Sequence, residues 1–157
     1  MRKRLTQEEI IAKIGQEIGK SEWLRIDQDR IDAFAACTED CQWIHVDQKK
    51  AAAGPHGKTV AHGLLLLSLI PHLSRNVSLV PEGAVMTVNY GINRARFIHP
   101  VPVGCEIRDT LLLNALSDKG DDKILLSIQH TIHIREQAEP ACVAEMLRMY
   151  LIAPPQR

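Results

Sequence analysis

The sequence lacks the features that mark several large classes of protein. Aromatic residues make up only 4% of its 157 residues, and Lys plus Arg equals Asp plus Glu, at 19 each. Without a basic excess to hold a polyanion, nucleic acid is not expected as the main partner. Apolar runs such as Leu64–Leu67 are far too short to span a bilayer, so no membrane partner is expected either.

Paired cysteines and an export signal are also missing. The four cysteines form no Cys-x-x-Cys pair, and the basic start "MRKRLTQEEII" leads into acids instead of an apolar stretch. Both observations favour reduced thiols and a cytoplasmic location. Cys37, Cys41 and His45 do fall at the four-residue spacing that zinc ligands on one helix can have, but no fourth ligand is evident. We therefore expect core thiols, and neither a metal nor another cofactor.

What is present is an ordinary globular composition, 45% apolar and 24% charged, in a chain long enough for one domain with a real core. We expect a single domain over residues 1–157. A capping box at Thr6–Glu9 predicts a short helix with Ile10, Ile11 and Ile14 on one apolar side. Asp27 is typical of the cap of a second helix.

The longest apolar segment and the pattern after it set the fold class. The stretch that follows His62 is apolar on nearly every side, which predicts a helix buried on most sides and bent or ended near Pro71. After it, residues 84–98, 103–116, 123–135 and 141–152 are strand-like, with a hairpin loop at 117–122. Helices followed by antiparallel strands indicate the α+β class, with a sheet curled around one buried helix.

The segment "TEDCQWIHVD", residues 38–47, carries both an apolar body and titratable groups. The apolar side chains of Trp43 and Ile44 are typical of a buried core, whereas the ionisable side chains of Asp40 and His45 are not. Taken alone, Asp40 could be a turn acid and His45 a core histidine. Alternatively, the two side chains could hold a water for acid–base chemistry. Asp47 fits the cap of the next helical turn.

Residues 34–73 resemble the hydratase motif of MaoC-like dehydratases, especially the NodN-like branch. The motif's acid, histidine and second acid match Asp40, His45 and Asp47, and its helix-opening His-Gly matches His62-Gly63. The stretch "NYGINRARFIHPVPVG" at 89–104 resembles the next landmark of the same branch. Two departures are Gln42-Trp43, where many members have Asn-Pro, and Glu39, where many have glycine.

The resemblance implies a hot-dog fold, in which an antiparallel sheet wraps a long central helix, and a homodimer. It implies an (R)-specific enoyl-CoA hydratase of fatty acid metabolism, which adds water reversibly to trans-2-enoyl thioesters to give (R)-3-hydroxyacyl thioesters. The catalytic acid and histidine would be Asp40 and His45, and the Gly63 amide would hold the thioester oxygen. The substrate would be an acyl-CoA or an acyl carrier protein thioester.

Other roles for these residues and for the chain stay open. Gly63 could instead be small for close packing, and His62 could cap the helix or shape the pocket. Tyr90 and Asn93 could line a substrate pocket or simply face a sheet. An acyl-CoA thioesterase would want a carboxylate on the central helix, and residues 62–74 contain none. A non-catalytic acyl-thioester binding protein is the other alternative.

Overall fold

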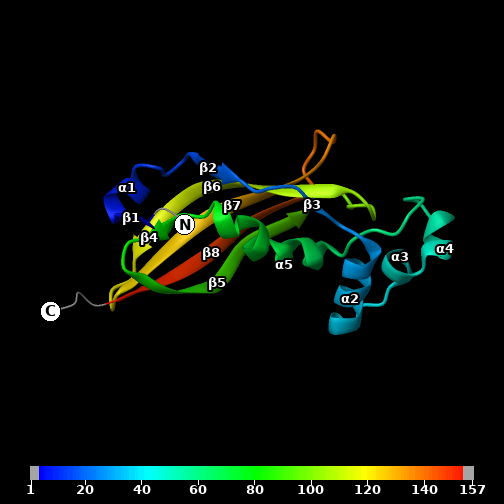
Figure 1. Ribbon diagram of the computed structural model, residues 1–157, viewed down its shortest axis with the longest axis horizontal. Coiled ribbons are helices and arrows are strands. Elements are labelled where there is room, and N and C mark those ends of the chain that lie inside the picture. The colour runs from blue at the N-terminus through cyan, green and yellow to red at the C-terminus, as the bar shows by residue number, and fades with distance from the viewer. Residues whose placement is uncertain (1–3, 154–157) are drawn as a thin grey trace.

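The computed structural model describes residues 4–153, and its main feature is a long antiparallel sheet with one helix against its face (Figure 1). The elements in chain order are β1 (Arg4–Leu5), α1 (Gln7–Ile11), β2 (Glu17–Lys20), β3 (Leu24–Arg25), α2 (Gln28–Thr38), α3 (Trp43–Val46), α4 (Gln48–Ala52), α5 (Gly63–Leu73), the 3-10 turn η1 (Ser74–Asn76), β4 (Val80–Pro81), β5 (Ala84–Phe97), β6 (Glu106–Asp118), β7 (Lys123–Ile134) and β8 (Cys142–Ile152).

The sheet confirms the expected class. Its strands run in the order β2-β6-β7-β8-β5, with β3 also beside β6, and all of these pairs are antiparallel. The four strand-like stretches of the sequence become β5 to β8. The short strands β1 and β4 form a separate parallel pair. Because β6, β7 and β8 largely alternate buried and half-buried residues, one face of the sheet is available for a helix.

Helix α5 covers that face. It begins at Gly63 with His62 as its N-cap residue, and it ends two residues after Pro71, close to where the sequence places its end. Its buried residues pack on the sheet: Leu65, Leu66, Leu69, Ile70 and Leu73. The expected burial on most sides is only partly right, because Leu64 is 58% exposed and its side of the helix is open to solvent in the single chain.

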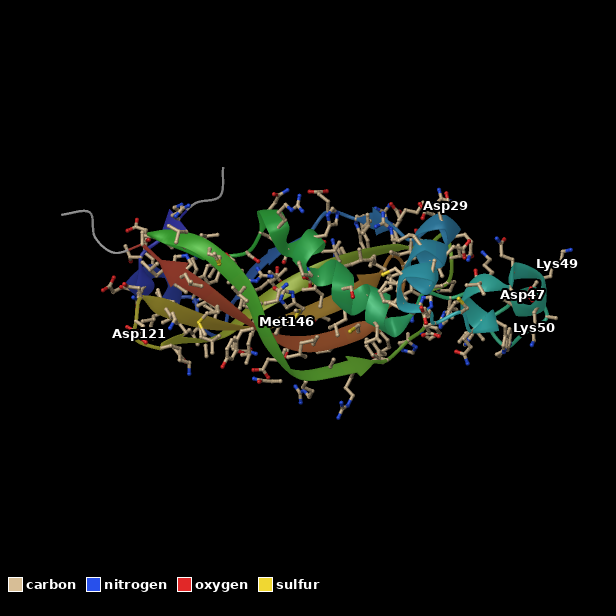
Figure 2. All side chains as sticks on the ribbon, turned by 90° about the horizontal axis from the view of Figure 1, so that it is seen from below. Asp29, Asp47, Lys49, Lys50, Asp121 and Met146 are labelled. Carbon is tan, nitrogen blue, oxygen red and sulfur yellow. The ribbon has the colours of Figure 1, made fainter. Side chains whose placement is uncertain are left out.

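The two ends of the sheet carry the remaining helices. Helices α2, α3 and α4 extend beyond one end, with charged side chains such as Asp29 and Lys49 directed to solvent (Figure 2). The Asp27 carboxylate caps α2 by accepting the Arg30 amide at 3.0 Å, as predicted. No helix among residues 4–153 has the length and apolar character needed to cross a bilayer.

Helix α1 covers the other end, and its capping box is also confirmed. The expected apolar side was wrong in part. Only Ile10 is buried, in a second core cluster with Leu111 and Leu113, whereas Ile11 and Ile14 are exposed. The helix ends after barely more than one turn, so only one of its isoleucines can face the sheet.

This difference predicts unequal effects of two neighbouring substitutions. Ile10→Ala should lower the free energy of unfolding by about 2–5 kcal/mol, because it removes fully buried methyl groups. Ile11→Ala is the matched control on the same helix and should cost less than about 1 kcal/mol. Urea unfolding followed by circular dichroism measures both. Equal losses in the two variants would contradict the packing of α1.

Candidate active site

The position of Asp40 follows from the way α2 ends. Glu39, the residue after the helix, adopts a left-handed conformation with φ 62° and ψ 12°, which turns the chain out of the helix. Glycine adopts this conformation at less cost than a residue with a side chain does. Asp40 follows directly and is exposed in the single chain. Its carboxylate is therefore open to solvent in the single chain.

His45 is held in the interior by backbone partners. It lies on the single turn α3 and is 7% exposed. Its Nδ1 donates to the carbonyl oxygen of Val60 at 2.6 Å, while the Val60 amide donates to the carbonyl of Ile44. A carbonyl can only accept, so the proton of the neutral imidazole is on Nδ1 and the lone pair is on Nε2.

Trp43 and Ile44 are half-buried, as expected of a segment that anchors this turn. The Trp43 ring lies so close to Gly54 that a Cβ there would be 3.1 Å from it. The Asp47 carboxylate accepts the Lys50 amide at 2.9 Å and caps α4, as the sequence indicates. The apolar body of the segment thus holds His45 in place.

Two supporting residues were missed from the sequence. Gln28, at the start of α2, donates to the His45 carbonyl at 2.8 Å, and it accepts from the hydroxyl of buried Thr59 at 2.5 Å. This bridge ties α2 to α3 and to the segment before α5. A glutamine in the first turn of a helix looks like a surface residue, so no sequence signal marks it.

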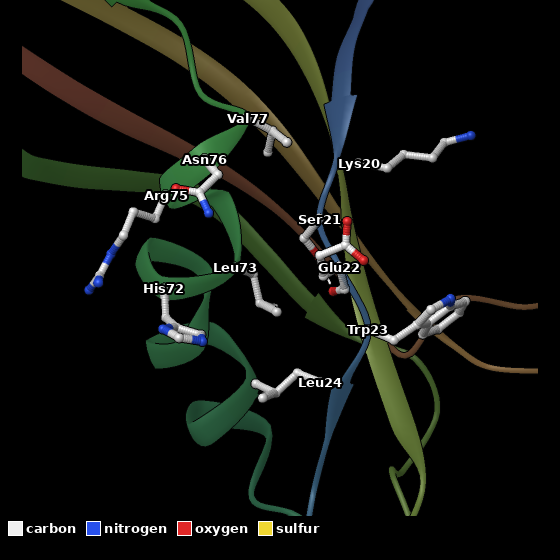
Figure 3. Close-up of a pocket in the computed structure, with 10 residues that line it drawn as sticks. All are labelled: Lys20, Ser21, Glu22, Trp23, Leu24, His72, Leu73, Arg75, Asn76 and Val77. Atoms are coloured by element: carbon white, nitrogen blue, oxygen red, sulfur yellow. Dashed lines mark hydrogen bonds between the residues drawn. The ribbon is translucent and has the colours of Figure 1, made fainter. Parts of the chain in front are cut away.

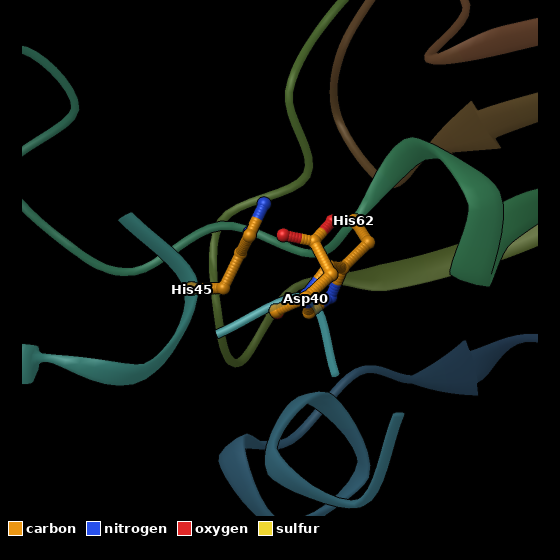
Figure 4. Close-up of side chains that lie close together, drawn as sticks. All are labelled: Asp40, His45 and His62. Atoms are coloured by element: carbon orange, nitrogen blue, oxygen red, sulfur yellow. The ribbon is translucent and has the colours of Figure 1, made fainter. Parts of the chain in front are cut away.

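His62 joins Asp40 and His45 in one cluster (Figure 4). The three side chains each offer a titratable atom, and these atoms lie within 4.8 Å of one another. The rings of His45 and His62 are stacked, with centroids 3.7 Å apart and planes 25° apart. Desolvation by burial is the main cause that lowers the pKa of His45, and the neighbouring His62 lowers it further. His45 is thus a neutral base near neutral pH.

Gly63 sits directly after this cluster, at the first position of α5. Amides in the first turn of a helix have no partner inside the helix and meet the positive end of its dipole. The ring of Phe97 lies over Gly63, and a Cβ there would be 2.7 Å from the ring. The structure therefore confirms the close-packing role of this glycine, and it leaves the first amides of α5 beside the cluster.

The cluster suits acid–base chemistry better than a metal. Imidazole lone pairs lie in the plane of the ring, and the two stacked planes run nearly parallel, so a shared ion would require one ring to turn out of the stack. Cys37 and Cys41 do not gather with His45 into such a group among the described residues. Both are exposed, which corrects their expected place in the core.

The structure does not bring Tyr90 and Asn93 to this cluster. The Asn93 amide donates to Glu145 at 3.0 Å, and Glu145 alternates along β8 with Ala144 and Met146, which pack toward α5. Asn93 therefore lies on the opposite face of the sheet. Tyr90 lines a shallow hollow with Val88, Lys119, Lys123, Met149 and Leu151 on that same outer face.

A separate cleft of about 290 Å³ lies near the C-terminal end of α5 (Figure 3). It runs between that end and the connection from β2 to β3, and its lining mixes Lys20 and Arg75 with Glu22 and Leu24. Neither Asp40, His45 nor His62 lines it. The acid–base cluster is at the other end of α5.

Together these residues can hold and deprotonate a water molecule. The neutral imidazole of His45 has a free lone pair on Nε2, and the Asp40 carboxylate lies beside it. The first backbone amides of α5 begin at Gly63, directly after His62. Such a set can move a proton and stabilise a developing negative charge on an oxygen.

The comparisons with known proteins agree with this arrangement. The model of the MaoC like domain matches residues 9–133. The chain is 41% identical over 143 residues to 3-hydroxyacyl-thioester dehydratase Z of Mycobacterium tuberculosis, covering 91% of this chain and 94% of that protein. It is 36% identical to nodulation protein N of Rhizobium leguminosarum, covering 98% and 96% of the two chains.

Solved structures share the architecture. An (R)-hydratase from A. caviae involved in PHA biosynthesis superposes with a TM-score of 0.69 at 26% identity, covering 86% of this chain and 94% of that one. A protein from Archaeoglobus described as a monoamine oxidase regulatory protein has a TM-score of 0.78 at 22% identity, covering 98% of each chain. The hot-dog fold expected from the sequence is confirmed, and the chain belongs to the MaoC-like dehydratase family.

Proposed function

We propose that this hydro-lyase is an (R)-specific enoyl-CoA hydratase, which adds water reversibly to a trans-2-enoyl thioester. The observation that carries the proposal is the convergence of Asp40, His45 and His62 within 4.8 Å at the N-terminus of α5. Support for the thioester comes from the dehydratase of M. tuberculosis, whose name describes the reverse reaction. Support for the (R) configuration comes from the structurally similar (R)-hydratase.

The first step is attack by water on C3 of the enoyl group. A water between the Asp40 carboxylate and His45 Nε2 donates one hydrogen bond to each. As its oxygen bonds to C3, His45 Nε2 takes a proton, because its lone pair is free and its Nδ1 proton stays with the Val60 carbonyl. The electron pair of the C2=C3 bond moves toward the thioester carbonyl and leaves an enolate.

The second step returns a proton to C2. The Gly63 amide, with the positive end of the α5 dipole behind it, stabilises the enolate oxygen. The protonated His45 then donates its Nε2 proton to C2, and the imidazole is neutral again. One proton leaves the water and one reaches C2, so the hydration is balanced, and the same path in reverse is a dehydration.

The alternatives are weaker. A thioesterase would use a carboxylate on the central helix, and α5 carries none between Gly63 and Leu73. A protein that only binds acyl thioesters has no need of a neutral base with its proton fixed on the far nitrogen. The carrier, coenzyme A or an acyl carrier protein, is a separate question from the chemistry.

We also propose that the chain forms a homodimer through β5. This strand of 14 residues pairs only with β8 among the described residues, so one edge is open along its length. Large apolar residues are exposed along it: Val85, Met86, Val88, Tyr90, Ile92 and Phe97. A long apolar edge strand in a single chain invites pairing with another strand.

The chemistry predicts the effects of two substitutions. Asp40→Asn and His45→Ala should each leave the fold intact and lower kcat for crotonyl-CoA by about 10²-fold or more. The double variant should lose far less than the product of the two, because both groups act on one water. Loss of the enoyl absorbance follows the rate, and product chirality tests the (R) assignment. Hydration by Asp40→Asn at close to the wild-type rate would exclude this mechanism.

The burial of His45 predicts the pH dependence. Because its pKa is lowered from the ordinary value of 6.5, the imidazole stays neutral, and therefore active as a base, below that pH. We expect kcat/KM for crotonyl-CoA to be level at neutral pH and to fall only as the pH drops through a midpoint below 6.5. A midpoint above 6.5 would argue against neutral His45 as the base.

The dimer is tested by charges placed on the open edge. Sedimentation velocity of the wild type at micromolar concentration should give twice the chain mass of 17.6 kDa. Val88→Asp combined with Ile92→Asp should shift the protein toward the monomer, since buried unpaired carboxylates oppose association. Ile11→Asp places one carboxylate on the exposed side of α1, away from β5, and should leave the dimer intact. A monomeric wild type would refute the proposal.

A further inference from the structure

We propose that His62 is a positioning residue of the hydration site, which holds the His45 ring and the Asp40 backbone in their working arrangement. This inference rests on the proposed function, and it assigns His62 a role other than helix capping or substrate binding. His62 is 2% exposed and lies at the N-cap position of α5. Its side chain contacts His45, Phe34 and Asp40.

The first contact is with two rings, one stacked on His62 and one tilted against it. His62 lies between His45, with ring centroids 3.7 Å apart, and Phe34 of α2, with centroids 5.0 Å apart and planes tilted by 53°. The hydrogen bond to Val60 fixes one edge of the His45 ring but leaves rotation about that bond. The stack removes this freedom, so the Nε2 lone pair of His45 keeps one direction.

The second contact reaches Asp40. The Nε2 of His62 lies 2.9 Å from the Asp40 carbonyl oxygen. Since a carbonyl can only accept, Nε2 carries a proton and donates it. Asp40 follows the left-handed residue Glu39, just beyond the end of α2, and its side chain is exposed. A bond from a buried ring therefore gives the carboxylate a fixed backbone in an otherwise open turn.

The third feature is a nitrogen without a partner. The Nδ1 of His62 is buried, and no group among residues 4–153 forms a hydrogen bond with it. As an N-cap residue, His62 makes no side-chain bond to the α5 amides, so it does not cap the helix. A buried unpaired nitrogen is costly for stability alone. The burial of this ring without a partner for Nδ1 is therefore better explained by its contacts with His45 and Asp40 than by stability.

The two imidazoles also interact electrostatically. Asp40 and His62 are the titratable groups that act on His45, and His62 opposes its protonation. Removing His62 should raise the pKa of His45 for two reasons: the neighbour that opposes its protonation is lost, and water gains access to the ring. A residue that only filled space would leave this pKa unchanged once its volume was replaced.

Four variants separate the contributions. His62→Ala removes the ring and both nitrogens, His62→Phe keeps a stacking ring without nitrogens, and His62→Gln keeps a donor that can reach the Asp40 carbonyl. His72→Ala is the control, because it removes an exposed imidazole from the same helix. The readouts are kcat and KM for crotonyl-CoA and the pKa of His45 from its imidazole NMR signals.

We expect His62→Ala to lower kcat about 10-fold or more, with KM within about 3-fold of wild type. The Phe and Gln variants should each recover part of kcat. The pKa of His45 should rise from wild type to His62→Phe and again to His62→Ala, and His72→Ala should match wild type in every readout. If His62→Ala is poorly folded, the kcat and the His45 pKa of the Phe and Gln variants still test the positioning role of His62.

Two results would overturn the inference: an unchanged kcat and His45 pKa in folded variants, or a loss confined to KM, which would make His62 a substrate contact. Failure of the proposed function looks different. In that case the wild type would not hydrate crotonyl-CoA, while the pKa of His45 would still rise in the His62 variants.

Discussion

The burial of α5 against the inner face of the sheet is the constraint on which the rest of the structure depends. Each of its five buried aliphatic side chains stabilises this packing by about 1.5–3 kcal/mol. Just before the helix, the Ala61 amide donates to the Val101 carbonyl at 2.8 Å, and Val60 bridges to Pro102. The segment that carries His62 is thus held between the sheet connection and α3, and His62 lies beside Asp40 and His45.

The sequence was sufficient for those parts of the fold that local pattern controls. Alternation along 123–135 and the apolar run after His62 predicted β7 and α5, and cap chemistry at Asp27 predicted α2. It was insufficient where long-range contacts decide. The carbonyl of Val60 sets the tautomer of His45, yet any residue supplies a carbonyl. Tyr90 and Asn93 could not be assigned to a face, because β5 shifts register between Asn89 and Gly91 and again between Ile92 and Arg94.

A second buried polar group ties the far end of α5 to the sheet. Arg148 of β8 donates to Ser78 at 2.5 Å and to Ser74, in η1, at 3.0 Å. His130 contacts Asp109 at 2.7 Å, and both are essentially inaccessible, so His130 is a core histidine. Desolvation is the largest cause that raises the pKa of Asp109, with His130 and then Arg148 opposing it. Burying such groups is costly unless they are paired. The hydrogen bonds from Arg148 to Ser74 and Ser78 hold η1, and with it the C-terminal end of α5, against the sheet.

The open edge of the sheet and the proposed oxyanion site are physically linked. Phe97, the last residue of β5, covers Gly63 with its ring and is itself 48% exposed. Any strand that pairs with β5 would lie beside this ring and limit its movement. The ring that packs on Gly63, the first residue of α5, therefore belongs to the same strand whose open edge we propose for assembly. The proposed pairing of two chains through β5 would thus also restrict the ring that packs at the N-terminus of α5.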